Sequence, residues 1–312
     1  MISSMETATN QSAESLDPTS AAVTRIAVGV DGFPEGNDAV VLGMALARVT
    51  GAQLMLVAVH SEPLIVVPAG LNWTSLRKEA RATLHKAREA WAPGARIVVE
   101  TDLSVPRALH RVVHRERRDL LVMGSSRHAP AGKVRIGKRT RQLLGRFECP
   151  LAVAPRGFHT RSDPGFARIG VGYDGGPESE AALELAGSIA AGAGAEMQMC
   201  GVVDDRFPPL SRSGLSKDGD DAARWEEAVM ADMERLRAEA DEATQGSAPA
   251  VRIEIRRGRP ADALLELSEQ VDLLVIGSRR WGPMTRLLLG STGEALLHDA
   301  SCPVLVVPRP SA

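Results

Sequence analysis

The chain has 312 residues and carries 37 Lys and Arg side chains against 39 Asp and Glu side chains. This near balance argues against a generic nucleic-acid binder, and an aromatic content of 3% leaves few rings on which single-stranded bases stack. Three cysteines give neither a disulfide framework nor metal-ligand spacing, and the length suits two ordinary domains.

The N-terminal segment contains no Lys or Arg and no apolar stretch, so it lacks the marks of a signal peptide. Its Ser, Thr, Ala and Glu content predicts a disordered tail over residues 1–23. No apolar stretch approaches the roughly 18 residues that a membrane-spanning helix needs. We therefore expect a cytoplasmic protein that contacts neither membranes nor nucleic acid.

Short apolar runs alternate with segments of helical spacing in the first half of the chain. Ile26 to Val30 predicts a buried strand, which ends in a turn at Asp31. The elements expected after it are a helix over 37–50, a strand over 54–59, a helix over 76–91, a strand over 96–100, a helix from Pro106, a strand over 120–123, a helix near 140–147 and a strand over 151–154. This alternation indicates a parallel sheet covered on both faces.

The second half of the chain repeats the first. Arg25-Ile-Ala-Val-Gly-Val-Asp-Gly returns from Arg168, and Asp119-Leu-Leu-Val-Met-Gly-Ser returns from Asp272, each with small changes. The corresponding elements are strands over 169–173, 197–203, 251–256, 273–276 and 304–307, and helices over 178–191, 222–243, 260–269 and 291–298. The chain is therefore expected to hold two copies of one α/β unit.

We expect the first copy to form a domain over residues 24–156 and the second copy a domain over 167–309, joined by a linker over 157–166. The predicted fold class is α/β, with two tandem, doubly wound parallel sheets of five strands each.

Polar and glycine residues follow the strands whose carboxyl ends would meet at one edge of each sheet. Ligands of open parallel sheets bind at this edge. The first strand of each copy ends in Asp31 or Asp174, and the fourth ends in Gly124 or Gly277. In the second copy a helix then begins near Gly290-Ser291-Thr292, where backbone N–H groups and hydroxyls can bind an anion.

These residues resemble the ATP-binding signature of the universal stress protein family. The signature has an Asp after the first strand and, after the fourth strand, Gly-x-x-Gly-(nine residues)-Gly-Ser/Thr. The resemblance covers nearly everything except the tail and the linker, and it is to tandem members of actinobacterial type. It implies a Rossmann-like fold and an adenine nucleotide bound between the strand-one Asp, a strand-two Val and the glycine-rich loop. The resemblance also implies that the strand over 151–154 pairs with that over 304–307, which suits open strand edges and gives an intramolecular pseudo-dimer that can in turn form a homodimer. Carried over, the implied residues are Asp31, Val59, Gly124 and Gly137 in the first copy, and Asp174, Val202, Gly277, Gly290, Ser291 and Thr292 in the second.

The two copies depart from the signature at three positions. The middle glycine is Arg127 in the first copy and Arg280 in the second, and Lys138 stands where the family has Ser or Thr. Arginine does not adopt positive φ as freely as glycine, yet its guanidinium can contact phosphates. Lys138 removes a hydroxyl but adds a cation where phosphates would lie. The second copy is the better match.

Structural explanations stand beside the functional ones. Asp31 and Asp174 are also typical turn residues, and Gly290 to Thr292 can simply cap a helix. His110 and His114 have the spacing of a metal pair but no third ligand nearby, so a solvated basic helix face is the better interpretation. A basic run is either a solvated loop or a lid that attracts anions; it comprises Arg127, Lys133, Arg135, Lys138, Arg139 and Arg141.

The sequence shows no Gly-x-Ser-x-Gly elbow, no Walker A lysine motif and no metal cluster, so we expect no catalytic residues and at most weak ATP hydrolysis. The first hypothesis is an ATP-binding regulator of stress response or dormancy, with or without magnesium, read by a regulatory protein partner. The alternatives are a slow ATPase on the same fold and an interaction scaffold that binds no nucleotide.

Overall fold

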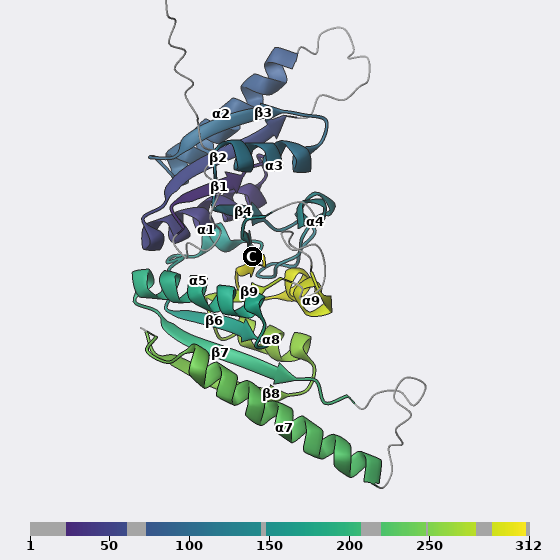
Figure 1. Cartoon of the computed structure of the whole chain (residues 1–312). Helices are drawn as coiled ribbons and strands as arrows, with labels where there is room; N and C mark the ends of the chain where they lie inside the picture. Colours follow the sequence, from purple (N-terminus) through teal and green to yellow (C-terminus); the bar gives the residue numbers. More distant parts are fainter. Residues whose placement is uncertain are drawn as a thin grey trace, which may run out of the picture.

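The computed structural model describes residues 23–60, 73–144, 148–206, 220–247, 249–278 and 289–309. These residues form a single sheet in the order β3-β2-β1-β4-β5-β10-β9-β6-β7-β8 (Figure 1). Its strands are β1 (Arg25–Gly29), β2 (Gln53–His60), β3 (Arg96–Thr101), β4 (Leu120–Gly124), β5 (Leu151–Ala154), β6 (Arg168–Tyr173), β7 (Glu196–Val203), β8 (Val251–Arg257), β9 (Leu273–Gly277) and β10 (Val304–Val307). The expected tail over 1–22 lies outside the described residues.

The helices follow the strands in the expected alternation. They are α1 (Pro34–Thr50), α2 (Trp73–Trp91), α3 (Val105–Arg115), α4 (Lys138–Leu144), η1 (Phe158–Thr160, a 3-10 helix), α5 (Pro177–Ala193), α7 (Asp220–Ala243), α8 (Pro260–Ser268) and α9 (Ser291–Asp299). α1 begins at Pro34, three residues before the expected start at Asn37. Proline is favoured in the first helical turn because its φ is already helical and it needs no N–H partner there. Residues 145–147, expected to continue α4, lie outside the described part of the chain.

The two copies meet at their fifth strands, as expected. β5 and β10 pair antiparallel, with Val304 opposite Val153 and Val306 opposite Leu151. Within each copy all neighbouring strands are parallel. The two five-stranded sheets therefore merge into one, and each covers an edge that the other would leave unpaired.

Helices cover both faces of the sheet and divide the core into two layers (Figure 1). One core cluster contains buried residues of α1, α2, α5 and α7 with one face of the strands. The other contains buried residues of α3, α4, α8 and α9 with the opposite face. Because successive strand residues point to opposite faces, Ile26 and Val28 lie in the first cluster and Ala27 in the second.

Residues at equivalent positions of the two copies meet near the pseudo-twofold axis. Val49 of α1 lies so close to Gly192 of α5 that a Cβ on Gly192 would overlap the Val49 carbonyl. Arg141 of α4 pairs with Glu294 of α9 at 3.5 Å. Val49 and Gly192 combine a large with a small residue, and Arg141 and Glu294 combine a positive with a negative one. If a first copy paired with another first copy, valine would meet valine and arginine would meet arginine at these positions. The contact therefore suits a first copy paired with a second copy.

The linker between the copies is held against α1 by hydrogen bonds and by a buried side chain. Phe158 is buried in the core, and the fully buried Asp38 of α1 accepts hydrogen bonds from the N–H groups of Gly157 and His159, each at 2.8 Å. The His159 ring nitrogen Nδ1 lies 2.5 Å from the same carboxylate. Val23, placed in the expected tail, is also buried, so ordered packing starts before residue 24.

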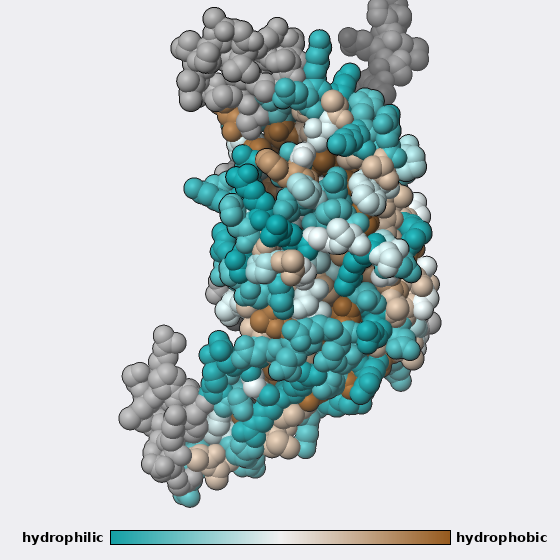
Figure 2. Space-filling model, turned by 180° about the vertical axis from the view of Figure 1, so that it is seen from behind, coloured by the Kyte–Doolittle hydropathy of each residue, from teal (hydrophilic) through white to brown (hydrophobic). Residues whose placement is uncertain are grey.

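The surface that faces the viewer in Figure 2 is mostly hydrophilic, and its hydrophobic residues form small separate areas. The large hydrophobic side chains that the described residues expose are Phe33, Trp91, Leu103 and Met230. None of the helices that the structure describes is long and apolar enough to cross a membrane.

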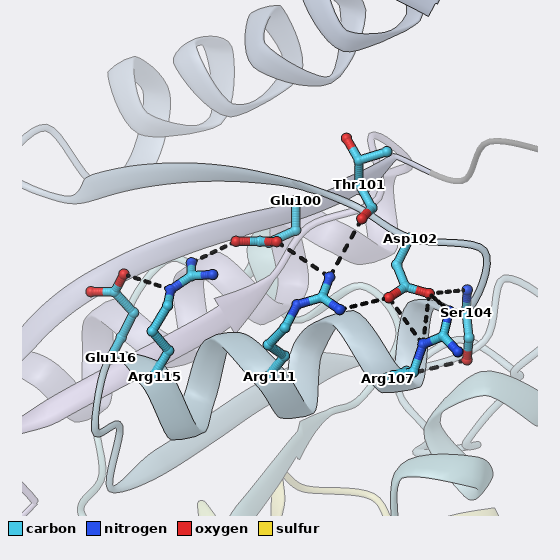
Figure 3. A network of polar contacts seen from close by, with 8 residues as sticks. All are labelled: Glu100, Thr101, Asp102, Ser104, Arg107, Arg111, Arg115 and Glu116. Carbon is cyan, nitrogen blue, oxygen red and sulfur yellow. Dashed lines mark hydrogen bonds and ion pairs between the residues drawn. The ribbon is translucent and has the colours of Figure 1, made fainter.

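Ion pairs fasten α3 to the edge strand β3 (Figure 3). Asp102, just beyond β3, pairs with Arg107 at 2.6 Å and with Arg111 at 2.9 Å, and Glu100 pairs with Arg115 at 2.5 Å. The arginines of α3 thus lie on an exposed basic face, as expected, and in addition form ion pairs with acids at the end of β3. Hydrogen bonds from Arg107, from the Ser104 N–H and from Arg111 hold the pKa of Asp102 far below its usual range.

This depressed pKa makes a testable contribution to stability. A carboxyl group with a lower pKa in the folded state stabilises the fold above its unfolded pKa, near 3.9, and loses that contribution as the pH falls. We expect Asp102→Asn to be less stable than wild type at pH 7, and the gap to narrow between about pH 5 and pH 2. Urea unfolding across this range measures it; a gap that does not change with pH would contradict the ion-pair origin.

Candidate functional site

A cavity of about 570 Å³ opens at the carboxyl ends of β1, β2 and β4. We call it the first cavity. It lies at the point where the strand order reverses between β1 and β4, on the face covered by α3 and α4. Its lining includes the apolar side chains Val57, Val59, Leu109 and Met123 together with polar groups from the strand ends. Volume and lining are those of a small-molecule site.

The structure brings together all the residues that the sequence indicates for the first copy. The residues concerned line this one cavity: Asp31, Val59, Gly124, Arg127, Gly137 and Lys138. They come from four separate stretches of the chain, so only the parallel sheet and its crossovers place them side by side. Phe33, Glu35 and Arg139 also line it, although sequence reasoning did not assign them to the site.

The second copy has a corresponding cavity of about 260 Å³ at the ends of β6, β7 and β9. We call it the second cavity. The predicted residues that line it are Asp174, Val202, Gly277, Gly290 and Thr292. Ser291 is exposed on the first turn of α9 and is not part of this lining. Arg280 lies outside the described residues.

Asp31 and Asp174 form turns and also face the cavities. Asp31 Oδ1 accepts the Phe33 N–H at 3.1 Å, and Asp174 Oδ1 accepts the Gly176 N–H at 3.0 Å. The turn interpretation is therefore correct for both residues, and each bond engages only Oδ1. Partial burial raises the pKa of Asp31, and nearby Glu35 raises it further, while the Phe33 N–H and Arg139 act in the opposite direction.

Gly124 and Gly277 have a packing role that the signature alone does not reveal. A Cβ on Gly124 would overlap the carbonyl oxygen of Glu35, in the first turn of α1. A Cβ on Gly277 would lie 2.6 Å from the carbonyl carbon of Glu178, in the first turn of α5. These glycines let a helix N-terminus approach the end of the fourth strand. Gly137 differs, because the nearest atom to its Cβ would be 3.8 Å away.

The basic run divides into two groups. Neither a solvated loop nor a lid that attracts anions describes both of them. Lys133, Arg135 and Arg141 reach the second copy, where they pair with Glu269, Asp299 and Glu294, respectively, at 3.5 to 3.7 Å. The other three, Arg127, Lys138 and Arg139, line the first cavity. None of the ion pairs formed by described residues involves these three cations.

Arg127 and Phe33, which both line the first cavity, contact each other. The guanidinium carbon of Arg127 lies 5.3 Å from the centroid of the Phe33 ring, which is 50% exposed. Such a cation–π contact positions the guanidinium while its N–H groups can still bind an anion. The position equivalent to Phe33 in the second copy is Gly176, so the second copy has no aromatic side chain at this position.

The second cavity ends against the first turn of α9. Gly290 is the N-cap residue, with φ −82° and ψ 176°, and no side chain caps the turn. The N–H groups of this turn thus meet the cavity at the positive end of the helix dipole. Among the described residues, two buried polar atoms of the same lining form no hydrogen bond: Ser278 Oγ, and Glu178 Oε1, which instead lies 3.6 Å from Arg309 Nε. The Ser278 hydroxyl is therefore placed to bind a polar ligand.

Two glutamates line the cavities although the sequence analysis did not assign them to a site. Glu35 and Glu178 occupy equivalent positions in the first turns of α1 and α5, and each lines a cavity. Glu35 pairs with Arg156 at 3.4 Å, and Glu178 pairs with Arg309 at 3.6 Å. An alignment of the two copies places Glu35 opposite Glu178 and Arg156 opposite Arg309. This agreement is a signal from which the sequence could have indicated these residues.

His110 and His114 stack on α3 with ring centroids 6.4 Å apart. Within the described ranges, the structure contains no group of three or more His, Cys, Asp or Glu residues arranged to hold a metal ion.

Two α/β units with cavities at equivalent strand ends define a tandem, Rossmann-like class of protein. The universal stress protein family model matches residues 22–155 and again residues 165–308. The chain therefore belongs to the universal stress protein family, with two copies of the family domain.

Known proteins agree with this assignment. A universal stress protein of Mycobacterium tuberculosis is 28% identical over 290 residues, which cover 90% of this chain and 96% of that protein. A single-copy relative of Thermus aquaticus is 32% identical over 148 residues, 46% of this chain and 98% of its own length. A crystal structure of a universal stress protein from Archaeoglobus fulgidus has a TM-score of 0.64 at 21% identity, covering 92% of this chain and 99% of the other, which shows the same fold.

Proposed function

We propose that this protein binds ATP, with or without magnesium, in both cavities, and that the bound state is a regulatory signal in stress response or dormancy. The domains over 24–156 and 167–309 would each hold one nucleotide, and a protein partner in the cytoplasm would read the bound state. A ligand can act in this way by shifting the population of two conformations that it binds unequally.

The observation that carries the proposal is the set of cations in the first cavity that take part in none of the ion pairs of the described residues: Arg127, Lys138 and Arg139. Asp31 and Glu35 of the same lining balance only part of this positive charge, and a polyphosphate would neutralise the rest. Their neighbours Lys133, Arg135 and Arg141 are all neutralised by the second copy, so the difference is local.

The remaining lining suits a nucleoside. Val57, Val59 and Met123 offer an apolar surface to a base, and the second carboxylate oxygen of Asp31 can accept a ribose hydroxyl. The first turn of α9 offers N–H groups to phosphates in the second cavity. Lys138 and Arg127, which break the family signature, thus fit the same type of ligand through charge.

Lys138→Gln tests this proposal. A charged hydrogen bond contributes about 1.5–3 kcal/mol, so we expect the variant to bind ATP at the first cavity about tenfold more weakly. ATP should bind more tightly than AMP, and added salt should weaken wild-type binding more than variant binding. Isothermal titration calorimetry with Mg-ATP measures both effects.

The matched control is Lys86→Gln, which removes the same charge from an exposed position of α2, on the opposite face of the sheet. It should bind ATP as wild type does. Equal affinities in wild type and Lys138→Gln, or no ATP binding by wild type, would reject the proposal. Phosphate release that depends on Lys138 would identify the slow ATPase instead.

A further inference from the structure

α9 extends from the second cavity to a segment of the first copy that precedes the lining of the first cavity. Its first turn, with Gly290, Thr292 and Gly293, lines the second cavity. At its other end, Leu297 and the C-cap residue Ala300 contact residues 134–136 of the first copy. Nine helical residues span about 13 Å, so one rigid element lies between the second cavity and this segment.

Backbone hydrogen bonds tie the far end of α9 to the first copy. The Val134 N–H donates to the Ala300 carbonyl at 2.8 Å, and the Ile136 N–H donates to the Leu297 carbonyl at 2.9 Å. Val134 is fully buried and Ile136 is 8% exposed. Gly137 and Lys138, which follow at once, line the first cavity. Movement of α9 must therefore move this lining or break buried hydrogen bonds.

Ion pairs add a second connection along the same helix. Arg135 pairs with Asp299 at 3.6 Å near the C-terminal end of α9, where a positive charge also favours the helix dipole. Near the N-terminal end of α9, Glu294 pairs with Arg141 of α4 at 3.5 Å. α4 carries Lys138 and Arg139 of the first cavity, and α4 and α9 lie side by side at the centre of the molecule (Figure 1).

The N-terminal turn of α9 packs closely against side chains that line the second cavity. A Cβ on Gly293 would lie 2.9 Å from Leu289 Cδ2 and 3.7 Å from Ile276 Cδ1, and both side chains line that cavity. A ligand that fills the second cavity and contacts the first turn of α9 would therefore act on a closely packed helix end, and would shift the helix or hold it more firmly.

We infer that the two cavities are energetically coupled through α9, so that occupancy of the second cavity changes the binding properties of the first. This inference rests on the proposed function, because it requires a ligand in each cavity. Linkage makes the effect reciprocal, and couplings between protein sites commonly change affinity by about fivefold or more.

The test uses the full chain with its first cavity disabled. Lys138→Glu places a negative charge among the cations of that cavity at an exposed position, while the second cavity stays intact. Mg-ATP is titrated into this variant, and hydrogen–deuterium exchange is followed at the amides of Val134 and Ile136. We expect a change of about threefold in their exchange rates, saturating together with heat release from the second cavity.

A second variant examines the route. Arg135→Ala with Arg141→Ala, added to Lys138→Glu, removes the two ion pairs and should reduce the exchange response. Unchanged exchange while calorimetry shows the second cavity filled would overturn the coupling alone. A full response without the two arginines would support the coupling and assign it to the backbone hydrogen bonds of Val134 and Ile136. No ATP binding by wild type at either cavity would overturn the proposed function, and the coupling with it.

Discussion

Gly124→Ala will lower the free energy of unfolding by about 3 kcal/mol. Gly124 is the last residue of β4, and a Cβ there would overlap the backbone carbonyl of Glu35 in the first turn of α1. A backbone atom cannot rotate away as a side chain can, so α1 must withdraw from the sheet. Glu35 and Asp31 stand at that same end of α1 and line the first cavity, so ATP binding should weaken as well.

Gly137→Ala is the matched control, because both glycines belong to the same loop signature and line the same cavity. Its Cβ would meet nothing closer than Ser126 Cβ at 3.8 Å, so we expect a change below about 1 kcal/mol. Urea unfolding of the two variants measures the difference. Equal losses of stability would show that Gly124 is not set apart by its contact with α1.

Gly192→Ala will destabilise the protein by about 2–3 kcal/mol at the contact between the two copies. Gly192 of α5 touches the backbone of Val49 in α1, and an added methyl group would overlap the Val49 carbonyl. The two helices belong to different copies, so they must separate, and the buried residues that they share lose contact. Thermal and urea unfolding measure the loss.

Gly187→Ala supplies the opposite result within the same helix. A Cβ on Gly187 meets no atom within 4 Å, so replacement should stabilise α5 by about 0.5–1 kcal/mol through helix propensity alone. Opposite signs for the two substitutions would establish that the close approach of Val49, rather than helix propensity, controls position 192. Two changes of the same sign would count against it.

Local patterns were enough to predict the elements and the order of the fold. Buried apolar strands such as Ile26 to Val30, alternating with amphipathic helices, left a parallel doubly wound sheet as the natural arrangement. Ligands bind at the strand ends of such sheets, and Asp31 and Gly124, which this rule indicates, line one cavity. Lys138, which only the family resemblance indicates, lines the same cavity. The start of α1 was predicted too late because proline was taken to end a turn rather than begin a helix.

The roles of individual charges could not be predicted in the same way. Six basic residues within 15 positions look alike in sequence, yet Lys133 donates to Ser301, 168 positions away, while Lys138 lines a cavity. The sequence predicted a linker over 157–166, but it did not indicate that Asp38 accepts hydrogen bonds from the backbone N–H groups of Gly157 and His159. Contacts at such separations have no local signature, because the partner is brought close only by the completed sheet.

The sequence by itself determined the duplication, the parallel sheet and the position of both cavities at the strand ends, because each follows from short-range periodicity and the internal repeat. Only the tertiary structure decided which glycines serve packing, which cations of the basic run form ion pairs with the second copy, and which residues of the first copy α9 contacts. These properties depend on atoms of one copy facing atoms of the other, and pairs such as Val49 with Gly192 acquire meaning only when β5 and β10 join the copies.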